Sequence, residues 1–322
     1  MDGRSDELDG GVMSAVAAGI VAGSVADRIF GDPAKRHPVA GFGRAAKTLE
    51  RALWRPRRRS GVVFTLTLVV ATGAAAGIVD ARLRTRPLAR AAFVAAALWT
   101  ALGGHSLGRA ALRVADAVHR GDLDEARRLA PALVGRDPRA LGGAELCRAA
   151  VESVAENTAD AIVGPLFWGA LAGPVGIVSY RAANTLDAMV GHHNERYEQF
   201  GWAAARVDDA LTWPAARLAA MLTVLLAPLS GGNSANAWRV VRRDGGAHPS
   251  PNAGLLEAAF AGAFGVRLGG RNQYGDRVEE RPAIGDGPAP DPDTVIRAVR
   301  LSELVGIAAT AICTLAAWRL RR

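Results

Sequence analysis

Long apolar stretches without charged residues alternate with polar stretches along the 322-residue chain. Residues 61–79 and 91–108 contain no Asp, Glu, Lys or Arg, and each is close to the roughly 20 residues that a helix needs to cross a bilayer. With four further apolar runs, the pattern predicts spans at 11–29, 61–79, 91–108, 161–179, 212–230 and 303–318. The chain is therefore predicted to be an all-α, multi-pass integral membrane protein that forms one membrane-embedded domain over residues 1–322. A soluble helical protein with buried core helices is the alternative.

The run at 161–179 differs from the other spans because glycine and proline interrupt it. It contains Gly164, Pro165, Gly173, Pro174 and Gly176. Proline removes a backbone donor and bends a helix, and glycine weakens it. Two interpretations stay open: a kinked membrane helix, or a re-entrant hairpin that lines a cavity.

The polar stretches between the spans are also expected to be helical, at 31–60, 109–160, 181–211 and 231–302. Strand signals are weak because apolar and polar residues rarely alternate with a period of two. Asp122 followed by Glu125 is typical of a helix start. The sequence therefore predicts helices throughout, with loops where glycine and proline gather.

Charge changes this picture by pointing to a partner. The net charge is +8, and Lys35 and Lys47 are the only lysines. Arginine-rich runs lie beside apolar segments, at 55–59, 82–90 and 319–322. This placement favours anionic lipid headgroups over a nucleic-acid groove, so we expect membrane lipids and no nucleic acid as partners, and a multi-pass location in the cell membrane. A codon bias towards arginine is the alternative explanation.

Carboxylates recur on one face of the helix predicted after Gly143. Glu152, Glu156 and Asp160 follow at steps of four residues, which places them on the same side of an α-helix. A Mg²⁺ site uses one or two carboxylates plus phosphate oxygens, so these three are candidate metal ligands. The alternative is a solvated helix face, with Arg148 pairing Glu152 at i,i+4.

A second polar cluster follows the uncharged run. Arg181, Asn184 and Asp187 recur at three-residue steps, and His192, Asn194, Arg206 and Asp209 come after them. Arg181 and Arg206 are candidates for phosphate or carboxylate clamps, since a guanidinium makes bidentate contacts. An ion-pair network, such as Arg206 with Asp209, is the alternative. His192 is a candidate general base, against the alternative of a histidine that is only hydrogen-bonded near a turn.

Two shorter motifs complete the set of candidate residues. His248, Ser250 and Asn252 precede an apolar helix, with Ser250 as the expected N-cap and a proline directly after it. Backbone N–H groups at such a start bind anions, which makes phosphate a candidate ligand, against the alternative of an ordinary capped helix. Asp32 and His37 lie where the chain leaves the first predicted span.

Taken together, these motifs resemble those of the CobD/CbiB family, the membrane-bound adenosylcobinamide-phosphate synthases of cobalamin biosynthesis. The resemblance is carried by GDPAKRHPV (31–39), VGRD (134–137), ESVAENTADAIVGPLFW (152–168), YRAANTLDAMVGHHNERYEQFGWAAARVDD (180–209), HPSPNAGLLEAAFAGAFGVRLGG (248–270) and Tyr274-Gly275. It spans nearly the whole chain in order. Departures are modest: His193 replaces a basic or other polar residue, Thr212-Trp213 replaces an Asn–aromatic pair, and residues 40–42 are less bulky than usual.

The resemblance implies an amide ligase that joins a propionate carboxylate of (adenosyl)cobyric acid to (R)-1-amino-2-propanol or its O-phosphate, giving cobinamide or its phosphate. It implies ATP and Mg²⁺ as substrate and activator, although the chain has no known ATP-binding motif, and other late-pathway membrane enzymes as further partners. On this basis we expect Glu152, Glu156 and Asp160 to hold metal; Arg181, Asn184, Asn194, Arg206, His248, Ser250 and Asn252 to bind substrate or phosphate; and Asp187, His192, Asp209, Asp32 and His37 to handle protons.

Two other classes of function stay open. The first is a non-catalytic membrane sensor or accessory protein, similar to the AmpE proteins linked to β-lactamase regulation. The second is a small transporter, which would place ionisable residues in the middle of its spans. The long spans here are free of charge and the polar motifs lie at their ends, which favours the enzyme.

Overall fold

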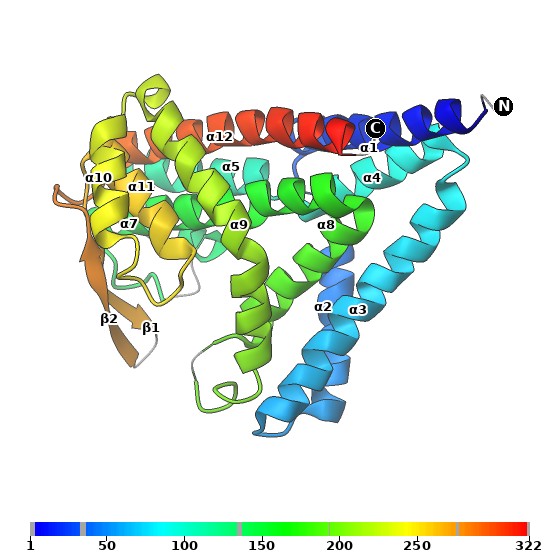
Figure 1. Ribbon diagram of the computed structural model, residues 1–322. Helices are drawn as coiled ribbons and strands as arrows, with labels where there is room; N and C mark the ends of the chain where they lie inside the picture. Colours follow the sequence, from blue (N-terminus) through cyan, green and yellow to red (C-terminus); the bar gives the residue numbers. More distant parts are fainter. Residues whose placement is uncertain (1–3, 33–36, 134–136, 193, 275–276, 321–322) are drawn as a thin grey trace. The chain divides into compact units, whose positions relative to one another are not determined.

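The computed structural model describes residues 4–32, 37–133, 137–192, 194–274 and 277–320, and only the backbone of residues 4–14, 271–274 and 277–280. Most of these residues are helical, which confirms the predicted fold class (Figure 1). The α-helices are α1 (Arg4–Phe30), α2 (Pro38–Leu53), α3 (Arg58–Leu83), α4 (Pro87–Ala101), α5 (Gly104–His119), α6 (Leu123–Leu129), α7 (Gly143–Asn157), α8 (Gly164–Val190), α9 (Trp202–Leu226), α10 (Ser234–Asp244), α11 (Ala253–Phe264) and α12 (Pro292–Arg319). Short helical segments are η1 (Ala130–Ala132), η2 (Thr158–Val163) and η3 (Ala227–Ser230), and the strands are β1 (Leu268–Tyr274) and β2 (Arg277–Ile284).

Within the described residues, five helical stretches are long and apolar enough to cross a membrane. They are Arg58–Leu83, Pro87–His119, Gly143–Val190, Trp202–Ser230 and Pro292–Arg319. Each contains a predicted span, which fits a membrane protein. The span predicted at 11–29 lies inside α1, whose side chains are described only from Ala15 onward, and stays a prediction. The span predicted at 91–108 is not one straight helix, because the backbone becomes extended at Leu102 between α4 and α5.

The contacts divide the chain into two compact units that are interleaved along the sequence. The first unit comprises residues 1–103, 164–212 and 309–322, and the second comprises residues 104–163 and 213–308. Each unit holds one buried free cysteine, Cys313 in the first and Cys147 in the second. The single domain predicted over residues 1–322 stays a prediction.

In the first unit, α1 packs along α4, and α3 and α4 pack against α8. Phe64 of α3 and Phe200 of the segment before α9 pack in a buried cluster, with their rings tilted by 41° and the ring centroids 5.0 Å apart. A buried bidentate ion pair joins α3 to α4, because Arg90 Nε and Nη2 donate to the two carboxylate oxygens of Asp80 at 2.7 and 2.9 Å. Such fork-to-fork geometry is among the stronger polar contacts in proteins.

Helix α8 turns back on itself at Gly173 and Pro174. Gly173 has φ 61° and ψ −145°, a conformation that is essentially restricted to glycine. A Cβ at Gly176 would overlap the carbonyl oxygen of Trp168, and a Cβ at Gly164 would overlap the ring of Tyr180. Residues 16 positions apart would lie about 24 Å apart in a straight helix. The segment 164–190 is therefore an antiparallel helical hairpin rather than a kinked helix (Figure 1). That this hairpin is re-entrant in a membrane stays a prediction.

In the second unit, α5 packs on α6 and α7, and α11 packs on α7 and α10. One prediction is wrong here: the region 231–302 is not wholly helical, since β1 and β2 form a two-stranded antiparallel hairpin. Two carboxylates bind the base of this hairpin. Glu152 Oε1 accepts from Gly269 N at 2.9 Å, and Asp244 Oδ2 accepts from Gly285 N at 2.8 Å. The sheet is thus fixed to α7 and α10 where it begins and ends.

Candidate functional site

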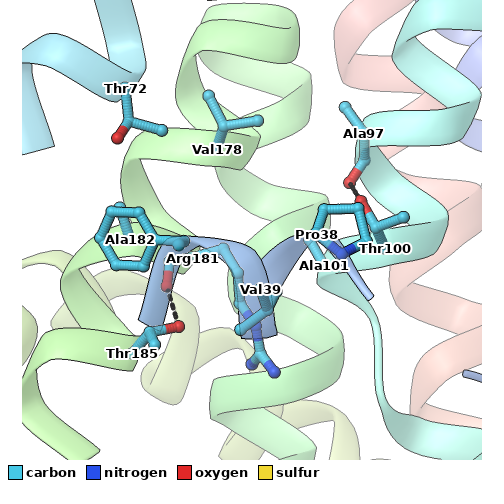
Figure 2. Close-up of a pocket in the computed structure, with 11 residues that line it drawn as sticks. Pro38, Val39, Thr72, Ala97, Thr100, Ala101, Val178, Arg181, Ala182 and Thr185 are labelled. Carbon is cyan, nitrogen blue, oxygen red and sulfur yellow. Dashed lines mark hydrogen bonds between the residues drawn. The ribbon is translucent and has the colours of Figure 1, made fainter. Parts of the chain in front are cut away.

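Arg181 lies at the wall of a small cavity in the first unit. The cavity has a volume of about 120 Å³. It is lined by Pro38, Val39 and Phe42 of α2, Thr72 of α3, Ala97, Thr100 and Ala101 of α4, and Val178, Arg181, Ala182 and Thr185 of the returning leg of α8 (Figure 2). Arg181 is the one charged side chain among these lining residues. The hairpin in α8 therefore brings a guanidinium to a mostly apolar cavity.

A hydrogen-bond relay holds Arg181 in place. Arg181 Nη1 donates to Asn184 Oδ1 at 3.2 Å, and Asn184 Nδ2 donates to Asp208 Oδ1 at 3.3 Å. Asp208 is buried on α9. Arg181 and Asn184, three residues apart on α8, are thus in contact, and the carboxylate at the end of the relay is Asp208.

Asp209 and Arg206 are on α9 and contact each other. Their closest atoms, Arg206 Nη1 and Asp209 Oδ2, are 3.5 Å apart, and the Arg206 side chain is 65% exposed. This is the i,i+3 ion pair that the sequence analysis gave as the alternative to a phosphate clamp. Exposed pairs of this kind contribute little to stability, so the pair leaves Arg206 open to solvent and to other anions.

Asp187 and the segment after it form a compact end to α8. Gly191 N donates to Asp187 O at 2.7 Å, and a Cβ at Gly191 would overlap the Asp187 carboxylate. His192 and Asn194 are exposed. Asn194 Oδ1 accepts from Tyr197 N at 2.9 Å, so this side chain stabilises a turn.

The segment around Tyr197 is bound to α2 through a carboxylate that the sequence analysis did not single out. Glu50 Oε1 accepts from Arg196 Nη2 and from the Tyr197 hydroxyl, each at 2.9 Å, and the Glu50 side chain is 7% exposed. Trp54 Nε1 donates to Arg196 O at 3.3 Å, and the Arg196 guanidinium lies 4.7 Å from the Trp54 ring centroid. The hydrogen bond to Glu50 is the main cause that raises the pKa of Arg196. The signal for Glu50 was its place on the buried face of α2, four residues after Ala46.

His37 and Asp32 lie on either side of four residues that are outside the described ones. His37 is the N-cap of α2, where its Nδ1 accepts from Val39 N at 3.2 Å. This hydrogen bond occupies the lone pair that a neutral imidazole would use as a base. Asp32 is exposed.

The three predicted metal ligands belong to the second unit, whereas Arg181 belongs to the first. Glu152 is buried, binds Gly269 N, and lies 3.8 Å from Arg148, which is the i,i+4 pairing that was the alternative to a metal site. Glu156 is exposed and Asp160 half-buried. Asp160 follows the start of the π-helix η2, whose wider turn changes the four-residue spacing on which the common face was predicted. In the described part of the chain, no three His, Cys, Asp or Glu side chains are grouped closely enough to hold a metal ion.

The motif at 248–252 does not cap α11 as predicted. Helix α11 begins at Ala253, and its N-cap is Asn252 rather than Ser250. Ser250 Oγ instead accepts from Asn252 N and Ala253 N, each at 3.3 Å, so it satisfies two N–H groups that the predicted anion site would have used. Asn252 Oδ1 accepts from Arg217 Nη1 at 2.8 Å.

His248 belongs to a cluster of charged groups around the β-hairpin. Its Nδ1 accepts from Ser250 N at 3.0 Å, and its Nε2 lies 3.4 Å from Arg281 Nη1 and 3.8 Å from Glu257 Oε1. Glu257 is 1% exposed. Neither Glu257 nor Arg281 was predicted, because a lone Glu in an apolar helix and an Arg in a polar strand carry no spacing signal.

Comparison with known proteins gives the family. The model of the CobD/CbiB protein family matches residues 20–302. A cobalamin biosynthesis protein CobD from Mycobacterium tuberculosis (strain ATCC 25618 / H37Rv) is 48% identical over 305 residues, which cover 95% of this chain and 97% of the relative. The protein of the same name from Geobacter metallireducens is 45% identical over 279 residues, which cover 85% of this chain and 88% of the relative.

A third relative named cobalamin biosynthesis protein CobD, from Chromobacterium violaceum, is 44% identical over 285 residues, with 85% of this chain and 88% of the relative covered. No solved structure matches the chain significantly. The family model covers well over half of the chain, and the relatives match along almost their whole length. The chain is therefore a member of the CobD/CbiB family of cobalamin biosynthesis proteins.

Proposed function

We propose that this protein is an ATP-dependent amide ligase of the cell membrane. It joins a propionate carboxylate of (adenosyl)cobyric acid to the amine of (R)-1-amino-2-propanol or its O-phosphate and releases cobinamide or cobinamide phosphate. Family membership and the printed names of the relatives support a role in cobalamin biosynthesis. The five apolar helices support a membrane location.

The observation that carries the proposal is the placement of Arg181. A guanidinium is held by Asn184 and buried Asp208 at a cavity whose other lining side chains are uncharged. A fixed arginine in an apolar setting attracts an anion more strongly than an arginine in water, because water screens the charge less. Three groups in the proposed reaction are anions: the corrinoid carboxylate, ATP, and the phosphate of the amine substrate where the O-phosphate is used.

The chemistry needs activation, since an amide does not form from a free carboxylate in water without a driving reaction. Transfer of the γ-phosphoryl group of ATP to the corrinoid carboxylate gives an acyl phosphate and ADP. The amine nitrogen then attacks the acyl carbon, inorganic phosphate leaves, and the ammonium proton passes to a base. Arginines hold the phosphate oxygens, and a carboxylate or imidazole takes the proton. We assign the arginine role to Arg181 and the proton roles to Asp187 and His192.

Mg²⁺ fits only part of the predicted ligand set. The Glu152 carboxylate already accepts a backbone N–H and lies beside Arg148, so it serves to hold the β-hairpin. Glu156 and Asp160 reach solvent. One carboxylate is enough for Mg²⁺ when phosphate oxygens and water complete its octahedral shell, so Glu156 would hold the ion. When bound there, the ion would neutralise phosphate charge.

The test is an assay of membrane fractions with cobyric acid and ATP–Mg²⁺, supplied with free (R)-1-amino-2-propanol in one arm and its O-phosphate in the other. Product is followed by mass. We expect cobinamide or cobinamide phosphate together with ADP. Asp187→Asn should abolish product formation, whereas Asp116→Asn, on the exposed face of α5, should leave it unchanged. The absence of product in every arm would contradict the ligase and favour a non-catalytic role.

A further inference from the structure

The cavity beside Arg181 has the size of a small metabolite. Its volume of about 120 Å³ is well below the roughly 300–1,000 Å³ of sites for drug-sized ligands. A nucleotide or a corrinoid exceeds it. A molecule of a few carbon atoms with one phosphate group is of the right order.

The polar groups at the cavity are divided into one donor and several acceptors. Thr72 Oγ1 donates its proton to Leu68 O at 2.7 Å, and Thr185 Oγ1 donates to Arg181 O at 2.7 Å. Thr100 Oγ1 does the same to Ala96 O at 3.0 Å. Figure 2 shows all three threonines among the lining residues. A hydroxyl whose proton is used in this way presents its oxygen lone pairs to a ligand. Arg181 offers only N–H donors.

We propose that this cavity binds the small amine substrate as its phosphate ester, a compact molecule with an anion at one end and an amine at the other. Arg181 holds the phosphate, and the threonine oxygens accept from the amine. This inference rests on the proposed function and adds the location of one substrate.

The apolar wall of the cavity should also distinguish between phosphate esters that differ by one methyl group. Val39, Ala97 and Val178 line the cavity. A methyl group on the carbon that carries the phosphate would contact such a wall, and burying one methyl group is worth about 0.8 kcal/mol. The cavity therefore prefers the phosphate ester of aminopropanol to that of ethanolamine by about fourfold, which is that free energy converted at 25 °C.

The first experiment fills the cavity. Ala97→Leu places a larger side chain in the wall, and Ala96→Leu is its matched control, since Ala96 is the neighbouring exposed residue of α4. We expect Ala97→Leu to raise the KM for the amine substrate at least about tenfold, or ~1.4 kcal/mol, with the KM values for cobyric acid and ATP unchanged. A KM for the amine that equals that of the control would overturn the assignment, and so would an equal rise in all three KM values.

The second experiment measures binding without turnover, so that it stays informative if the ligase reaction itself fails. Purified protein in detergent is titrated calorimetrically with aminopropanol O-phosphate, free aminopropanol and inorganic phosphate. We expect the ester to bind most tightly. Arg181→Gln should lower the affinity for the ester without lowering the affinity for free aminopropanol. Thr185→Val, which keeps the side-chain shape, should lower the affinity for aminopropanol O-phosphate and for free aminopropanol, but not the affinity for inorganic phosphate. Equal affinity of wild type and Arg181→Gln for the ester would overturn the proposal.

Discussion

The carboxylate of Asp187 occupies the position where a side chain on Gly191 would begin. Gly191 N also donates to Asp187 O at 2.7 Å, so the chain leaves α8 directly over its last acidic residue. A glycine permits this close approach because it has no Cβ. The carbonyl group of Asp187 is thus held by the backbone, and residue 191 cannot carry a side chain without moving the Asp187 carboxylate.

Gly191→Ala is therefore expected to abolish cobinamide formation. The added methyl group displaces the Asp187 carboxylate and with it the segment that carries His192. The measurement is product formation in membranes alongside the melting temperature in detergent. Gly41→Ala is the control, because that position in α2 has room for a Cβ and the change favours helix. Normal activity of Gly191→Ala would show that the position of Asp187 is not needed.

The pair of Asp80 and Arg90 should behave as a buried unit. Removing one partner, as in Asp80→Ala, leaves the other charge buried and unpaired, which costs about 3–5 kcal/mol. Removing both, as in Asp80→Leu with Arg90→Leu, should cost less than either single change. Thermal unfolding in detergent measures this. Additive losses in the double variant would argue that the two residues act independently.

Gly173 should be intolerant of any side chain. Its backbone conformation costs about 1–3 kcal/mol in a non-glycine residue. Gly173→Ala is therefore expected to lower the melting temperature and the activity together, because the returning leg of α8 carries Arg181. Gly77→Ala in α3 is the control, since a Cβ there would make only an ordinary contact with Val175. Equal melting temperatures in the two variants would contradict the hairpin.

Substitutions of Glu152 and of Glu156 should have different effects, the first on stability and the second on the Mg²⁺ dependence of the activity. Glu152→Ala is expected to lower the melting temperature by several degrees, because Gly269 N loses its acceptor and Arg148 its carboxylate. Glu156→Ala should leave the melting temperature unchanged and raise the Mg²⁺ concentration needed for half-maximal activity. A Mg²⁺ titration of both variants checks this. If Glu152→Ala altered only the Mg²⁺ dependence of the activity, Glu152 would be a metal ligand rather than a structural residue.

Acid should weaken the second unit at its β-hairpin. Arg243 donates to Asp244, and Arg239 and Arg243 donate to Asp286. These hydrogen bonds hold the pKa of Asp244 and of Asp286 below the usual range. Because both folded-state pKa values are depressed, the stabilisation is complete above the unfolded value of about 4 and is lost as the pH falls below it. Melting temperatures between about pH 2.5 and 6 should fall less steeply in Asp244→Asn than in wild type.

The sequence predicted the helices well and their reversals poorly. Uncharged runs of the right length identify apolar helices because burial in lipid and burial in protein select the same residues. The glycines and prolines of α8 permitted either a kink or a reversal, and contacts of Gly164 with Tyr180 and of Gly176 with Trp168 decided between them. Those contacts are tertiary. The β-hairpin was missed because its strands are polar and lack apolar alternation.

The candidate site was predicted as residue types rather than as contacts. Spacing placed Arg181 and Asn184 together correctly, since three residues along a helix share a face. It did not distinguish Asp208 from Asp209, which are adjacent in sequence but point about 100° apart on α9. Ser250 was expected to be the N-cap by its chemistry, whereas α11 begins after Asn252, whose side chain accepts a hydrogen bond from Arg217 of α9.

The interleaving of the two units has a practical consequence for dissecting the protein. The chain passes from one unit to the other after residues 103, 163, 212 and 308. Two of these passages lie inside the continuous helices α9 and α12. No single cut in the polypeptide, and no truncation from either end, releases one unit intact. Co-expression of split halves or swaps between orthologues must therefore exchange several segments at once, and a fragment that holds only half of the gene should be insoluble.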